Sequence, residues 1–170
     1  MKVTHIVVHY SATFRDEQIT AATIDKWHKE RGFKGIGYHF FYRLNGKEEV
    51  GRTLNEQGAH VRGKNKGKIG LCFAGGLDRS TGPDVGVNTM NLAQEKALIS
   101  RIRFLKVVYP DAIICGHKDL VSTQCPGFDV GAWWDEVVKN GYKPVFNKEK
   151  AIPGIKALKS IVRGYWYEGR

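Results

Sequence analysis

Two histidines and one cysteine stand where the folded chain could bind a metal ion. His9 ends a β-prone run that begins at Val3, and His117 follows the short apolar run 112–115. Cys125 lies eight residues after His117 in an irregular stretch. Zinc favours imidazole nitrogen and thiolate sulfur, and a catalytic zinc site uses three protein ligands with water in the fourth position. The three side chains are therefore candidate ligands of one Zn²⁺ ion per chain.

Residue type alone leaves a second interpretation open for these side chains. The chain contains six histidines and three cysteines, so it offers many possible sets of three. The two histidines could instead be hydrogen-bonded residues at strand ends, and the cysteine could be a small buried thiol. An odd and low number of cysteines argues against a disulfide framework, which leaves metal binding, catalysis or burial as their uses.

Strands that alternate with helices must position the candidate ligands. β-Branched and apolar runs predict the strands, and apolar residues at helical spacing after capping residues predict the helices. Asn45-Gly46 is the strongest hairpin signal in the chain, whereas residues 75–88 are rich in turn residues and are expected to form turns. This order predicts an α/β fold, a single domain with a central mixed β-sheet flanked by helices. Strands are expected at 3–9, 37–43, 47–52, 69–74 and 112–115, and helices at 20–32, 92–109 and 129–141.

Length and charge narrow the class of protein. The 170 residues fit one catalytic domain, expected over residues 1–141, and 42% hydrophobic with 26% charged residues is typical of a globular chain. The formal net charge of +10 favours an anionic partner, but no nucleic-acid-binding motif accompanies it, so no specific nucleic acid is expected. No apolar run is long enough for a transmembrane segment, and the N-terminal segment lacks the apolar stretch of a secretory signal. We therefore expect a monomer that is made in the cytoplasm.

Residues 142–170 differ in character from the preceding domain. Lysine and arginine are mixed there with isoleucine, leucine and valine, and Pro153 suits the first turn of a short helix. We therefore expect a basic amphipathic C-terminal extension. Three interpretations of it stay open: a helix that docks on the domain, a segment that binds anionic wall or outer-membrane polymers, or a segment that inserts at a membrane interface.

Six short motifs form the most specific pattern in the chain. In their order they resemble the N-acetylmuramoyl-L-alanine amidases of the phage T7 lysozyme and peptidoglycan-recognition-protein type, the amidase type 2 family. The resemblance spans residues 3–138, most of the expected domain. The motifs are Val7-Val8-His9-Tyr10-Ser11-Ala12-Thr13, Ile36-Gly37-Tyr38-His39-Phe40, Gly58-Ala59-His60, Ile69-Gly70-Leu71-Cys72-Phe73-Ala74-Gly75-Gly76, Gly116-His117 and Cys125-Pro126-Gly127-Phe128-Asp129.

The resemblance implies a zinc site made of His9, His117 and Cys125. The implied substrate is bacterial peptidoglycan, cut at the amide bond between the lactoyl group of N-acetylmuramic acid and the L-alanine of the stem peptide. Zinc would lower the pKa of its bound water towards about 7 and polarise the carbonyl as a Lewis acid. By the same resemblance, Tyr38 is a catalytic residue near the zinc and His60 lines the substrate groove. Their structural alternatives are a core aromatic residue and a solvent-facing loop histidine.

One position departs from part of the family. The T7-type enzymes usually carry a lysine two residues before the cysteine, whereas this chain carries Thr123, which together with Tyr38 resembles the catalytic peptidoglycan-recognition proteins. A hydroxyl can donate one hydrogen bond to an oxyanion but brings no positive charge. We therefore expect Thr123 to be catalytic with a smaller electrostatic effect, and Lys118 is a candidate replacement for the missing charge.

The leading hypothesis is a zinc-dependent, endolysin-like peptidoglycan amidase. If phage-encoded, it would wait in the host cytoplasm until lysis and then act on the cell wall. A non-catalytic peptidoglycan-binding receptor is the first alternative, although such receptors in this group typically lack the cysteine that stands here at position 125. The second alternative is a lysin that also binds and inhibits an RNA polymerase, a contact that no residue pattern reports.

Overall fold

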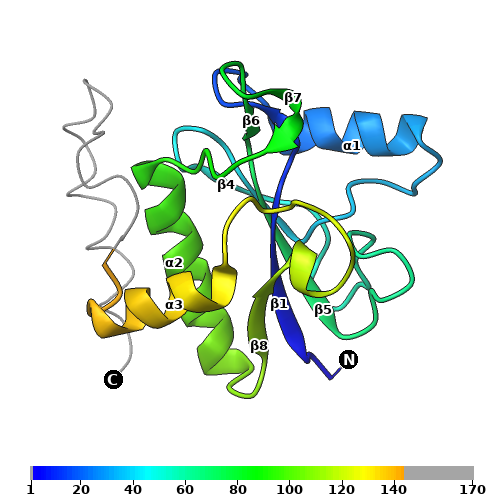
Figure 1. The fold of residues 1–170 in the computed structure, drawn as a ribbon. Helices are drawn as coiled ribbons and strands as arrows, with labels where there is room; N and C mark the ends of the chain where they lie inside the picture. Colours follow the sequence, from blue (N-terminus) through cyan, green and yellow to red (C-terminus); the bar gives the residue numbers. More distant parts are fainter. Residues whose placement is uncertain (1, 144–170) are drawn as a thin grey trace.

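A five-stranded mixed sheet forms the centre of the protein (Figure 1). The structure is a computed structural model and describes residues 2–143. The sheet consists of β1 (His5–Tyr10), β3 (Phe40–Tyr42), β4 (Glu48–Val50), β5 (Lys68–Phe73) and β8 (Ile113–Gly116). Its order is β4-β3-β5-β1-β8, with β3 and β4 antiparallel and all other neighbours parallel. The predicted α/β fold with a central mixed sheet is thereby confirmed.

Three helices cover the two faces of this sheet. They are α1 (Ala21–Glu30), α2 (Leu92–Val108) and α3 (Val130–Lys139). Figure 1 shows α2 and α3 on one side of β1 and α1 on the other. The larger core cluster accordingly joins Leu98 of α2 and Trp133 of α3 to Val8 of β1, and a smaller cluster joins Ile24 of α1 to Phe41 of β3. The sheet therefore separates two apolar layers, as expected when helices pack on both faces.

Local sequence signals lie where the elements begin and turn. The Thr20 side chain caps α1 and the Asp129 side chain caps α3, each by accepting a hydrogen bond from the backbone N–H three residues later. Gly46 has a φ of +79° in the turn between β3 and β4, and a Cβ there would lie 2.6 Å from the carbonyl oxygen of Ala93. The predicted hairpin and both predicted helix starts are confirmed.

The structure differs from the sequence-based expectation over residues 75–88. These residues, expected to form turns, contain β6 (Gly76–Asp78) and β7 (Gly82–Gly86). β6 pairs with both β7 and β2 (Thr13–Phe14) in a second sheet of order β2-β6-β7. The expectation was wrong because glycines with positive φ, such as Gly76 at +100°, interrupt the pattern by which strands are recognised. Gly76 also permits a close approach, since a Cβ there would lie 2.2 Å from the Tyr10 ring.

The C-terminal part of the chain is described only as far as residue 143. α3 ends at Lys139, and Gly141 follows with a φ of +64°. The predicted extension over 142–170 lies almost wholly outside the described residues and stays a prediction. Among residues 2–143, no helix is both long and apolar enough to cross a bilayer.

Gln94 joins α2 to the ends of the sheet strands. Its side-chain N–H groups donate hydrogen bonds to the carbonyl oxygens of Ala74 at 2.8 Å and of Tyr42 at 3.3 Å. Its side-chain oxygen accepts a hydrogen bond from the backbone of Asn91, the capping residue of α2, at 3.1 Å. Gln94 is fully buried, so a lost hydrogen bond here would not be replaced by one to bulk water.

Gln94→Leu should lower the free energy of unfolding by about 1–3 kcal/mol, because buried backbone groups lose hydrogen-bond partners. Urea denaturation measures the change. The control Gln18→Leu changes an exposed residue and should alter the free energy of unfolding by less than about 0.5 kcal/mol. Equal stability of the two variants would contradict the role assigned to Gln94.

Candidate metal centre and active site

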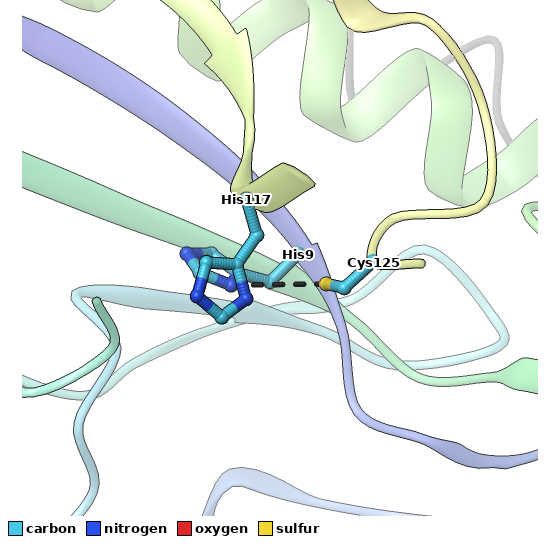
Figure 2. Close-up of side chains that lie close together, drawn as sticks. All are labelled: His9, His117 and Cys125. Carbon is cyan, nitrogen blue, oxygen red and sulfur yellow. Dashed lines mark hydrogen bonds between the residues drawn. The ribbon is translucent and has the colours of Figure 1, made fainter. Parts of the chain in front are cut away.

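The three predicted ligands converge at one edge of the sheet, and Figure 2 shows their side chains pointing toward one another. His9 lies near the C-terminal end of β1, His117 begins the short 3₁₀ helix η1 (His117–Asp119) after β8, and Cys125 lies in the loop before α3. Because β1 and β8 are parallel neighbours, their C-terminal ends meet at the same edge. One potential donor atom from each side chain lies within 4.8 Å of the others, and Cys125 Sγ is 3.8 Å from His9 Nδ1.

Two backbone contacts hold Cys125 at the sheet edge. The backbone N–H of Tyr10 donates a hydrogen bond to Cys125 Sγ at 3.3 Å, and that of Lys118 donates one to the Cys125 carbonyl oxygen at 2.7 Å. Lys118, the predicted replacement for a missing charge, is not among the described residues that line the adjacent pocket. Cys72 and Cys115 are free thiols like Cys125, so none of the three cysteines forms a disulfide.

Burial keeps the three candidate ligands neutral at pH 7. His9 is 1% exposed, and burial lowers its pKa well below 6.5, with smaller effects from His60 and His117. Burial also lowers the pKa of His117, and it raises the pKa of the Cys125 thiol to about 12 against an opposing effect of the Tyr10 N–H. Neutral imidazoles keep a lone pair available, whereas the thiol needs a nearby cation to lose its proton at neutral pH. Two imidazoles and one such thiol are a donor set that fits a zinc ion.

A pocket of about 230 Å³ opens beside these ligands. Tyr38 and Thr123 line it together with the three ligands, so five of the six predicted site residues share one pocket. The rest of its wall comes from the end of β1 with the segment that follows it, and from α1 with its C-terminal cap. The lining residues are His9, Tyr10, Ser11, Ala12, Ile24, Trp27, His28, Arg31, Tyr38, His117, Thr123 and Cys125.

Tyr38 lies in irregular backbone, because β3 begins at Phe40, later than the sequence predicted. Its ring centroid is 5.2 Å from that of His9. Burial raises the pKa of the Tyr38 phenol well above 10, and the Cys72 and Cys125 thiols add to this effect. The phenol is therefore protonated at neutral pH and can donate a hydrogen bond.

Thr123 lies in the same loop as Cys125 and is half-buried. Its Oγ1 accepts a hydrogen bond from the Cys125 backbone N–H at 3.3 Å. This contact fixes the hydroxyl oxygen and leaves the hydroxyl proton for another acceptor. Thr123 thus offers a single neutral donor on the pocket wall.

His60 lies against His9 and is not among the described residues that line the pocket. It is 8% exposed, and its Nδ1 is 2.9 Å from His9 Nε2. Burial, aided by His39, lowers the pKa of His60 to about 3, so its ring is neutral. The substrate contact implied by the family resemblance stays a prediction. Sequence reasoning missed the contact with a candidate ligand, because nothing in the sequence places residue 60 beside residue 9.

Helix α1 and its end form a pocket wall to which the sequence analysis gave no function. Trp27, His28 and Arg31 line the pocket on this side. Arg31 is the only lysine or arginine among the described lining residues, and none of the ion pairs formed within residues 2–143 involves it. The spacing of Trp27 and Arg31 puts them on one helical face, but no sequence signal orients that face toward His9.

Comparison with known proteins identifies relatives of this chain. A family model described as N-acetylmuramoyl-L-alanine amidase matches residues 1–128. The endolysin of Klebsiella phage KP32 is 37% identical over 135 residues, which cover 79% of this chain and 87% of the relative. The endolysin of Escherichia phage T7 is 35% identical over 133 residues, which cover 77% of this chain and 85% of the relative.

Solved structures give the same result. The amidase LysC from Clostridium intestinale superposes with a TM-score of 0.67 at 28% identity, covering 85% of this chain and 88% of that chain. The Ph2119 endolysin from a Thermus scotoductus bacteriophage superposes with a TM-score of 0.66 at 30% identity, covering 84% and 87% of the two chains. The chain therefore belongs to the N-acetylmuramoyl-L-alanine amidase family.

Proposed function

We propose that the protein is a zinc-dependent, endolysin-like amidase that hydrolyses the bond between N-acetylmuramic acid and L-alanine in bacterial peptidoglycan. The observation that carries the proposal is the convergence of His9, His117 and Cys125 within 4.8 Å, on a pocket that Tyr38 and Thr123 also line. Membership of the amidase family supports the same reaction and the same substrate.

His9, His117 and Cys125 would hold the zinc ion. When bound, zinc supplies a Lewis acid for the scissile carbonyl and a water molecule whose pKa is lowered towards about 7. Cys125 gives up its thiol proton on metal binding, because the thiolate is the form that binds a metal. The two imidazoles need no such change, since burial already keeps them neutral.

Tyr38 and Thr123 would supply the hydrogen bonds that amide hydrolysis requires. Attack on the amide places negative charge on the former carbonyl oxygen, and donors aimed at that oxygen stabilise the charge. Tyr38 has the larger effect in this scheme, because its phenol is shielded from solvent and a hydrogen bond is stronger where the dielectric constant is low. The same phenol can accept and donate, so it can also relay a proton toward the leaving nitrogen.

Arg31 gives the pocket a positive charge that suits an acidic substrate. Stem peptides of peptidoglycan carry free carboxylates, and a guanidinium group can bind a carboxylate through two hydrogen bonds. We therefore assign Arg31 to substrate binding. Contacts between residues 142–170 and anionic wall or outer-membrane polymers would be additional to this site.

A chelator should abolish the release of stem peptides from purified peptidoglycan, and added zinc should restore it. Cys125→Ala should stay inactive after zinc addition, because it lacks one of the three ligands. Mass spectrometry of the soluble products measures the release and identifies peptides that begin with a free L-alanine.

Cys115→Ala is the matched control, since Cys115 is a buried free thiol of β8 outside the pocket lining. It should retain both activity and its response to zinc. Activity that ignores chelation would refute the zinc mechanism. Binding of peptidoglycan without any release would identify the non-catalytic receptor instead.

Tyr38→Phe should lower kcat by about 10²–10³-fold, as the loss of one oxyanion donor does. Thr123→Val should lower kcat by only about fivefold, because a neutral hydrogen bond contributes roughly 1 kcal/mol. Steady-state kinetics on a soluble muramoyl peptide give both values. Zinc content should match that of the wild type in both variants, and Tyr109→Phe, outside the pocket, serves as the control. A larger loss in Thr123→Val than in Tyr38→Phe would contradict the assignment.

Zinc affinity should rise about tenfold per pH unit around neutral pH, because binding releases one proton from a thiol whose pKa is about 12. His9 and His117 should add nothing to this slope, since their lowered pKa values leave them neutral in the same range. Competition with a chromophoric chelator at several pH values measures the slope. A slope near two would show that a histidine also loses a proton, and a slope near zero that the thiol is already ionised.

A further inference from the structure

A pair of buried histidines lies under the candidate metal centre. His9 Nε2 is 2.9 Å from His60 Nδ1, and the two rings meet edge to face at 85°. On its other side, His60 Nε2 lies 3.4 Å from the carbonyl oxygen of Lys68 in β5. A chain of contacts therefore runs from a backbone carbonyl through His60 to His9.

The Lys68 carbonyl oxygen at the end of this series of contacts sets the direction of each hydrogen bond in it. A carbonyl oxygen can only accept, so His60 Nε2 carries a proton and donates to Lys68. The neutral ring of His60 then has a bare Nδ1, which accepts the proton of His9 Nε2. His9 Nδ1 is left with its lone pair, and this is the atom that lies 3.8 Å from Cys125 Sγ.

The surroundings of His60 leave its ring little freedom. A Cβ at Gly58 would lie 2.4 Å from the His60 ring and one at Gly70 would lie 2.7 Å from it, so two glycines make the space for this side chain. Asn65 Oδ1 accepts hydrogen bonds from the backbone N–H groups of His60 and Val61, both at 2.8 Å. Side chain and backbone of His60 are both anchored.

We infer that His60 is a positioning residue that fixes the tautomer of His9, so that His9 presents Nδ1 to the metal. This inference rests on the proposed zinc site. Metal-bound histidines commonly donate their second ring N–H to a carboxylate, a carbonyl or a water, and loss of such a partner costs 10–100-fold in metal affinity or activity. Here a second imidazole, itself oriented by Lys68, takes that place.

The tautomer of His9 can be measured without any metal. Long-range ¹H–¹⁵N spectra of zinc-free, histidine-labelled protein should show His9 protonated at Nε2. His60→Asn places an amide oxygen near the former Nδ1 and should preserve this tautomer, whereas His60→Leu should give a mixture of both. A wild-type His9 protonated at Nδ1, or a tautomer unchanged in His60→Leu, would overturn the inference.

Zinc affinity provides the second readout. Chelator competition should show affinity about 10–100-fold weaker for His60→Leu and closer to wild type for His60→Asn. His39→Asn is the matched control, because His39 is also buried and its ring lies 5.9 Å from that of His60, but it forms its hydrogen bonds with Gly70 and Glu56. It should lower stability without weakening zinc binding.

These measurements separate the inference from the proposed function. Wild-type protein that binds no zinc would refute the proposed function, while the tautomer measurement in zinc-free protein would still decide the role of His60. If His60→Leu fails to fold, the His9 tautomer in the wild type and the zinc affinity of His60→Asn decide the role of His60. Equal loss of zinc affinity in His39→Asn and His60→Leu would reduce His60 to a packing role and overturn the inference.

Discussion

The parallel pairing of β1 with β8 is the constraint on which the site depends. Val8 lies opposite Gly116, so the next residues, His9 and His117, come together at the same edge of the sheet with ring centroids 4.5 Å apart. A shift of one residue in this register would turn one histidine to the opposite face. Cys125 reaches the same edge from the loop before α3. The packing of α3 on the core fixes the position of this loop.

The electrostatics of the site favour a metal ligand over a cysteine nucleophile at position 125. In a nucleophilic Cys–His pair, a protonated histidine stabilises the thiolate and lowers the thiol pKa. Here burial acts in the opposite sense and raises the pKa of Cys125 to about 12, beside imidazoles whose own pKa values are lowered. The neutral imidazoles therefore supply no positive charge to stabilise a Cys125 thiolate, and the neutral thiol supplies no negative charge to stabilise a protonated imidazole. In the proposed zinc site, the divalent cation would supply that positive charge.

The sequence predicted most of what depends on local structure. Donor chemistry and recognisable strand ends made His9, His117 and Cys125 a possible set of ligands, and the resemblance of the six motifs to the amidase family singled this set out. The hairpin and the helix starts followed from Asn45-Gly46 and from capping residues. The small sheet formed by β2, β6 and β7 was missed, because its strands are short and glycine-rich. The pocket wall formed by α1 and the contact of His60 with His9 were missed for another reason: both arise where segments distant in sequence pack together.

Gly70 sets a limit on how this protein can be stabilised. It lies inside β5 opposite Val7, where glycine is a poor strand residue and costs roughly 0.5–1 kcal/mol relative to alanine. General strand preferences taken alone would therefore suggest a β-branched replacement at this position. Such a replacement would take the space that the His60 ring occupies. A substitution chosen from strand preference alone would therefore strain the packing around His60, so the residue with the poorest strand preference is one to leave unchanged.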